Sequence, residues 1–151
     1  MDLKLFVTEF ADSKKEIERG LKSKTEQVIL HLFKLYLMPD NESRNHWMRE
    51  IANFLNSVSL LSGKNKFPIS KQIYEWTYDK YQDVITNTTY IRKMTYDIID
   101  DYGVDISKSY SQICDEFDRI CENYFKWLSN ELSQSGFVSR REIFDKLNEL
   151  I

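Results

Sequence analysis

The chain has 151 residues, of which 42% are hydrophobic and 14% aromatic, and its formal net charge is −3 at pH 7. This content excludes an intrinsically disordered chain, and the presence of only four glycines and two prolines disfavours a turn-rich β-sandwich. A chain of this length buries enough surface to fold without a metal or disulfides, so we expect one domain over 1–151.

Apolar residues recur at spacings of three and four along the chain, which predicts an all-α fold. The expected helices cover, in chain order, about 3–21, 23–38, 43–62, 70–85, 91–102, 106–133 and 140–150. About six to seven amphipathic helices can bury their apolar faces together in an antiparallel bundle or a compact helical array.

Local signals support these boundaries. Two segments match the capping-box pattern of a helix start, Ser23-Lys24-Thr25-Glu26 and Ser139-Arg140-Arg141-Glu142. Four residues mark expected helix ends, because proline lacks an amide donor and glycine adopts a left-handed turn readily: Pro39, Gly63, Gly103 and Gly136.

The segment 106–133 has the clearest helical pattern. Its apolar residues are spaced 4-3-4-3-4-3, and further apolar residues flank them. The spaced residues are Ile106, Tyr110, Ile113, Phe117, Ile120, Tyr124 and Trp127. Such a wide apolar stripe favours a central bundle helix over a two-stranded coiled coil, so we expect the other helices to surround it.

Compartment signals point to the cytoplasm. Acidic residues interrupt the apolar residues at the start of the chain, and no apolar run approaches the eighteen residues of a membrane span. We therefore expect a soluble cytoplasmic protein with no membrane partner. Cys114 and Cys121 lie two helical turns apart, which is too far for a relaxed disulfide, so both are expected to be reduced, buried and inert.

The second half of the chain is acidic and rich in tyrosine. Residues 70–151 carry a net charge of −5 and eight of the nine tyrosines, whereas 1–69 carry +2. Tyrosine is favoured at interfaces, and an acidic surface attracts basic proteins and repels phosphate backbones. This pattern predicts a non-catalytic module that binds a basic protein, as inhibitor, immunity or antitoxin proteins do, and disfavours nucleic acid. The expected binding residues are Tyr74, Tyr78, Asp79 and Asp83.

A second hypothesis is a metal-dependent enzyme. Asp97, Asp100 and Asp101 are spaced i, i+3 and i+4, so their carboxylates could converge on Mg²⁺ or Ca²⁺. The structural alternative is that these residues are solvated and that Asp101 or Asp105 caps the next helix. A third hypothesis is a structural subunit of a homo-oligomer.

Recognised catalytic spacings are absent from the sequence. It contains no His-Glu-x-x-His, Glu-x-x-His or Cys-x-x-Cys motif, and its isolated glycines form no phosphate-binding loop. No cofactor is therefore expected, and the balance favours a protein without catalytic activity.

One segment resembles a known family. The run His31-Leu32-Phe33-Lys34, followed by Pro39, Ser43 and Trp47, is similar to the all-helical family numbered twenty-nine among domains of unknown function. That family typically shows a His-Leu-Leu-Lys run, a proline-containing turn and a Ser-x-x-x-Trp-like helix start. The resemblance covers about residues 24–60. It implies an all-α fold and no particular activity, and it makes His31, Lys34 and Trp47 candidate site residues.

Overall fold

The computed structural model describes residues 3–64, 82, 88–135 and 137–151, and this part of the chain is helical with no β-strand. The helices are α1 (Leu3–Leu37), α2 (Arg44–Lys64), α4 (Thr88–Tyr102), α5 (Tyr110–Ser135) and α6 (Arg140–Leu150). The all-α prediction is therefore confirmed. The helix expected over 70–85 lies outside the described residues.

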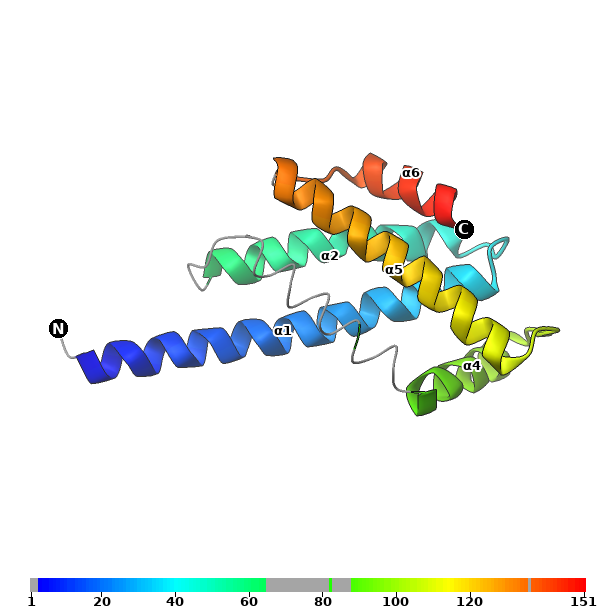
Figure 1. Cartoon of the computed structure of the whole chain (residues 1–151), viewed down its shortest axis with the longest axis horizontal. Helices are drawn as coiled ribbons and strands as arrows, with labels where there is room; N and C mark the ends of the chain where they lie inside the picture. Colours follow the sequence, from blue (N-terminus) through cyan, green and yellow to red (C-terminus); the bar gives the residue numbers. More distant parts are fainter. Residues whose placement is uncertain (1–2, 65–81, 83–87, 136) are drawn as a thin grey trace.

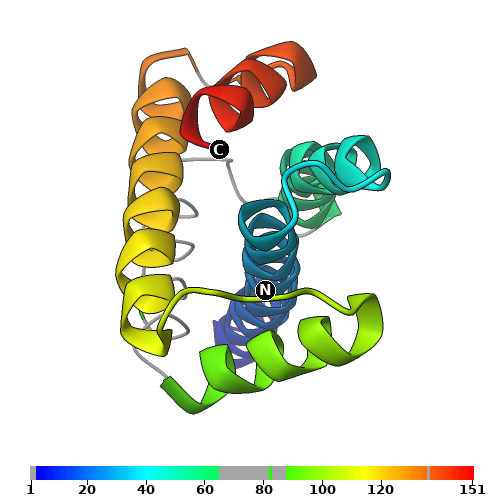
Figure 2. The ribbon, with the colours of Figure 1, turned by 90° about the vertical axis from the view of Figure 1, so that its right-hand side faces the viewer.

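The helices pack around an antiparallel pair formed by α1 and α2 (Figure 1). Helix α5 crosses α1, and α6 packs against both α5 and α2. Helix α4 lies across the C-terminal end of α1, and the connection between α4 and α5 passes the same end of α1 (Figure 2). The arrangement thus places the connection between α4 and α5 beside the last turns of α1.

Helix α1 contradicts the expected break between 3–21 and 23–38. It has 35 residues and runs without interruption through Gly20 and the Ser23–Glu26 pattern. A glycine inside a helix costs about 1 kcal/mol relative to alanine, which is less than starting a new helix requires. Thr25 is fully buried, so the Ser23–Glu26 segment lies against the core as part of the continuous helix α1.

Helix α5 begins later than expected. Its first residue is Tyr110, because Ser109 and Gln112 form a capping box that caps the helix at this point. The Gln112 amide donates to the Ser109 hydroxyl at 3.2 Å, and the Ser109 amide donates to the Gln112 side-chain oxygen at 3.0 Å. At 26 residues, α5 is shorter than α1, which is the longest described helix.

Two of the expected helix ends, at Pro39 and Gly103, agree with the structure, whereas Gly63 lies inside its helix and is not the stop that was expected. Helix α1 ends at Leu37, two residues before Pro39, and α2 continues one residue past Gly63. Gly103 has a φ of +63°, the left-handed conformation that glycine tolerates best, and its amide donates to the Ile99 carbonyl at 2.8 Å. Gly136 lies outside the described residues.

The core lies where α5 meets α1. Phe33 and Phe117 are fully buried, and their rings meet edge to face with centroids 4.8 Å apart. The other large, fully buried side chains are Tyr124, Phe125, Ile29, Leu32, Leu35 and Ile51. The stripe predicted over 106–133 supplies the α5 side of this core. The expectation that the other helices surround this segment is not confirmed, because the most extensive helix contact among the described residues is that of α1 with α2. The expected number of six to seven helices is not confirmed either, since the described residues form five.

Helix α6 closes the core through a capping box that the sequence predicted. The Glu142 amide donates to the Ser139 hydroxyl at 3.1 Å, and the Ser139 amide donates to the Glu142 carboxylate at 3.3 Å. Two arginine contacts link α6 to the α1–α2 pair. Arg44 donates to the Asn148 side chain at 2.6 Å, and Arg140 donates to Asn53 at 3.2 Å.

Replacing Ser139 with alanine is expected to lower the free energy of unfolding by about 1 kcal/mol, because the Glu142 amide at the start of α6 loses the hydroxyl that accepts from it. Urea denaturation of the wild-type and Ser139→Ala proteins measures this change. Ser139→Asp serves as the control, since aspartate at this position also accepts from the Glu142 amide and should retain most of the stability. Equal loss in both variants would contradict the assignment.

Tyr124 carries a buried hydroxyl with no hydrogen-bond partner in the described part of the chain. Its side chain is fully buried beside Phe125 and Trp127, and burial raises its pKa. Tyr124→Phe is therefore expected to stabilise the protein by about 1 kcal/mol, because it removes an unpaired polar group and retains the ring. Thermal and urea unfolding measure this effect, and a loss of stability would reveal a partner for the hydroxyl.

Both cysteines are free thiols, as expected. Cys121 is fully buried, and burial raises the pKa of its thiol well above the ordinary value. Cys114 is only partly buried, which corrects the expectation that both are interior residues.

Candidate functional site

The C-terminal half of α4 presents an acidic surface that also carries tyrosine. Asp97, Asp100 and Asp101 are exposed, and none forms an ion pair with a basic side chain of a described residue. Tyr96 is 60% exposed and Tyr102 is 43% exposed. We call these five residues the α4 acidic face.

The charge of this surface is unusually one-sided. Residues 94–107 contain four aspartates and no lysine, arginine or histidine. Helix α4 also lacks a basic residue in its last turn, where Asp100 and Asp101 lie. Carboxylates at a helix C-terminus oppose the macrodipole, which costs about 0.3–1 kcal/mol each, and like charges spaced i, i+4 repel. The carboxylates of the α4 acidic face thus lie where the macrodipole of their own helix is unfavourable to negative charge.

The metal hypothesis gains no geometric support. Within the described residues, no three His, Cys, Asp or Glu side chains are grouped so that they could hold a metal ion. Asp97, Asp100 and Asp101 all belong to this part of the chain and are exposed. They share one helix, and no ligand from another of the described helices joins them.

Two of the three residues suggested by the resemblance come together. The Lys34 ammonium lies 5.9 Å from the ring centroid of Trp47 and 5.7 Å from that of Tyr102. The two rings meet edge to face at 6.0 Å. Each cation–π contact contributes about 0.5–1 kcal/mol at an exposed site. This cluster joins the last residue of α4 to α1 and α2, and so fixes the position of the α4 acidic face.

His31 lies one turn before Lys34 and faces α2. Its Nδ1 lies 2.6 Å from the Gln27 carbonyl oxygen, so this nitrogen carries the proton that it donates. His31, Gln27, Glu50 and Asn53 line a small hollow of about 90 Å³ between α1 and α2. Burial and the neighbouring Lys34 lower the pKa of His31, whereas the Gln27 bond and the Glu50 carboxylate oppose this shift.

The lowered pKa of His31 predicts a pH dependence of stability. Between about pH 7.5 and pH 5.5 the unfolded chain binds a proton at His31 more readily than the folded protein does, so acidification destabilises the fold. Urea denaturation over this range is expected to show a smaller loss of stability in His31→Gln than in the wild type. Parallel pH profiles would contradict the assignment.

A polar network links α1, the connection between α4 and α5, and α5 itself, and it contains none of the site residues expected from the sequence. The Tyr36 hydroxyl and the Lys108 ammonium both donate to Oε2 of Glu116, the latter at 2.5 Å. These bonds, led by that from Lys108, lower the pKa of Glu116, while burial and the Glu116 carboxylate raise that of Tyr36. Tyr36 and Glu116 are 80 residues apart, so no local sequence signal could have linked them. The network holds the α4–α5 connection against α1.

The binding residues expected from the sequence, Tyr74, Tyr78, Asp79 and Asp83, lie outside the described residues. The α4 acidic face has the same composition, with exposed tyrosines beside carboxylates. The sequence indicates the α4 acidic face through the absence of basic residues over 94–107.

Comparison with known proteins found no match to this chain among protein-family models, curated proteins or solved structures. Of the helices that the structure describes, none combines the length and apolar character needed to cross a bilayer.

Proposed function

We propose that this protein is a non-catalytic protein-binding module of the inhibitor, immunity or antitoxin type, and that the α4 acidic face binds a basic partner protein. The observation that supports this proposal is one short stretch of helix that combines exposed tyrosines with carboxylates for which no described basic side chain forms an ion pair. Tyr96 and Tyr102 are two of the three exposed large hydrophobic side chains among the described residues.

The two residue types have complementary roles at such a surface. The carboxylates accelerate encounter with a basic protein and exclude acidic ones, and the tyrosines supply buried contact area with a hydrogen-bonding tip. The unfavourable placement of Asp100 and Asp101 at the end of α4 is then compensated when a basic partner neutralises them. Tyr102, held by Trp47 and Lys34, is pre-positioned for contact, which limits the entropy lost on binding.

The binding surface that we propose extends beyond α4. The acidic, tyrosine-bearing segment with Tyr74, Tyr78, Asp79 and Asp83 directly precedes α4 in the chain. We propose that it contributes to the same interface and that binding occurs in the cytoplasm. The alternative of a homo-oligomeric subunit is an outcome of the experiment below.

The test is a capture experiment in the cells that naturally produce the protein. Tagged wild-type protein is crosslinked and purified with and without nuclease, and its partners are identified by mass spectrometry. The comparison variant carries Asp97→Asn, Asp100→Asn and Asp101→Asn. A matched control removes three exposed acidic groups elsewhere through Asp40→Asn, Glu42→Gln and Asp145→Asn.

The proposal predicts a basic protein that survives nuclease and is recovered with the wild type and the control but not with the α4 variant. Equal recovery with all three proteins would place the binding surface elsewhere. Crosslinks only between copies of this chain would instead favour the homo-oligomer, for which the 68% exposed Phe137 would be a candidate contact.

A further inference from the structure

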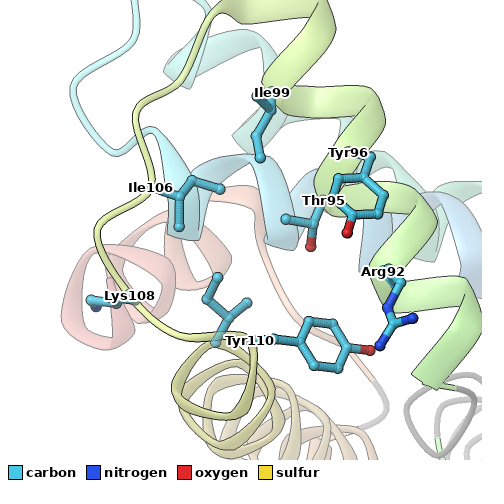
Figure 3. A pocket seen from close by; sticks show the side chains of 8 residues that line it. Arg92, Thr95, Tyr96, Ile99, Ile106, Lys108 and Tyr110 are labelled. Atoms are coloured by element: carbon cyan, nitrogen blue, oxygen red, sulfur yellow. The ribbon is translucent and has the colours of Figure 1, made fainter.

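A cavity lies between α4 and the start of α5, and the connection between these helices forms one of its sides (Figure 3). Its volume is about 250 Å³, and every residue that lines it belongs to the described part of the chain. The cavity is distinct from the exposed carboxylates of the α4 acidic face, although Tyr96 borders both. It is open to solvent on one side and large enough to hold part of a small organic molecule.

The walls of the cavity combine aliphatic and aromatic side chains with three polar ones, Arg92, Thr95 and Lys108. Ile99 from α4, Ile106 from the connection and Ile113 from α5 contribute aliphatic surface. Tyr96 and Tyr110 add two rings at its edge. Sites of this kind, with apolar walls and a few polar groups that fix orientation, are typical of small-molecule binding.

The charge of the lining contrasts with that of the neighbouring helix end. The lining includes two cations, Arg92 and Lys108, and no carboxylate. Lys108 points away from Arg92 in Figure 3, and its ammonium is engaged by Glu116. Arg92 remains available, because no described carboxylate pairs with it.

Arg92 is also held in place. Its guanidinium carbon lies 5.2 Å from the ring centroid of Tyr110, and the two side chains approach each other across the cavity edge (Figure 3). Stacking on an aromatic ring restricts a guanidinium while leaving its edge free to bind a carboxylate through two parallel hydrogen bonds. An exposed cation thus stands at one end of an apolar cavity.

We infer that this cavity binds a small organic acid, whose carboxylate pairs with Arg92 and whose apolar body lies among Ile99, Ile106 and Ile113. The ligand class follows from the combination of a positioned guanidinium, with which no described carboxylate pairs, and a cavity whose lining includes three isoleucines and no carboxylate. A neutral molecule would leave Arg92 unused, and an acid without an apolar body would leave the cavity empty.

The test uses three probes on the isolated protein, without any partner. They are 4-phenylbutyrate, its neutral analogue 4-phenylbutanamide, and acetate, which has the carboxylate alone. Titration followed by ¹H–¹⁵N NMR gives each dissociation constant and locates the affected amides. We expect 4-phenylbutyrate to bind at least about tenfold more tightly than either of the other probes, because only it uses both the charge and the apolar walls.

Substitution of Arg92 tests whether its guanidinium binds the carboxylate directly or whether the net charge of the protein alone attracts the acid. Arg92→Gln is expected to weaken 4-phenylbutyrate binding at least about tenfold and to leave binding of the amide unchanged. Lys93→Gln is the matched control, since Lys93 is exposed, adjacent in sequence and outside the cavity lining. This variant is expected to bind 4-phenylbutyrate within about twofold of the wild type.

Three results would overturn the inference. The first is equal affinity of the wild type for the acid and the amide, which requires no variant to fold. The second is equal loss of affinity in Arg92→Gln and Lys93→Gln, which would indicate a nonspecific charge effect. The third is the absence of shifts at Thr95, Ile99 and Ile106 with up to about 10 mM 4-phenylbutyrate, which corresponds to an affinity too weak for a built site.

Discussion

Replacing Phe33 with alanine is expected to lower the free energy of unfolding by about 3–5 kcal/mol, because the change removes a fully buried ring and leaves a cavity. Phe33 lies on α1 and meets Phe117 of α5 edge to face at 4.8 Å. Both rings also contact Tyr36, with centroids 6.3 Å and 6.1 Å away. No other pair of rings links these two helices so directly within the described core.

Urea denaturation of Phe33→Ala, Phe117→Ala and the double variant measures this contact. The edge-to-face pair should appear as a coupling of about 0.5–1.5 kcal/mol, so that the double variant loses less stability than the two single losses combined. Phe137→Ala is the control, because its 68% exposed ring should change stability by less than about 0.5 kcal/mol. Losses of similar size for Phe33 and Phe137 would contradict the described core.

Reversing the charge at the end of α4 is expected to weaken partner binding while stabilising the free protein. Lysines at positions 100 and 101 would complement the negative end of the helix macrodipole, adding about 1 kcal/mol to the free energy of unfolding. The same Asp100→Lys and Asp101→Lys changes would place positive charge against a basic partner, which should raise the dissociation constant more than about tenfold. Opposite changes in stability and affinity distinguish a binding surface from a merely solvated one.

The control for this double variant reverses two exposed charges elsewhere, through Asp40→Lys and Asp145→Lys. It changes the net charge equally and tests the long-range part of the attraction. Denaturation and binding assays on both proteins at low and high salt complete the comparison, since screening should reduce the difference between them. An unchanged affinity in the Asp100→Lys, Asp101→Lys protein would remove the α4 acidic face from the interface.

Signals that act within one turn of a helix allowed parts of the fold to be predicted from the sequence. The left-handed turn at Gly103 and the capping box at Ser139 depend on neighbouring residues only, and both occur as expected. The break expected near Gly20 failed because helix cooperativity outweighed one glycine and an unused capping pattern. Helix α5 begins at Tyr110 and not at 106, because Ser109 and Gln112 form a reciprocal cap. The Ser-x-x-Gln spacing of these residues is a local signal that the sequence carries.

The candidate site could be predicted only in part. Composition alone indicates an acidic, tyrosine-bearing second half, and it includes the aspartates at the end of α4. The contact of Lys34 with Tyr102 and the bond from Tyr36 to Glu116 join distant segments, so they depend on how the helices pack. The same holds for the cavity beside Arg92, whose walls come from α4, α5 and their connection.

Hydrogen exchange of the complex with the captured basic partner tests the central claim most directly. Amides are compared in the free protein and in the complex at matched salt concentration. The account predicts slower exchange over 96–102 of α4 in the complex, and little change in α6. Protection of α6 with unchanged exchange at the end of α4 would contradict the proposal that the α4 acidic face is the binding surface.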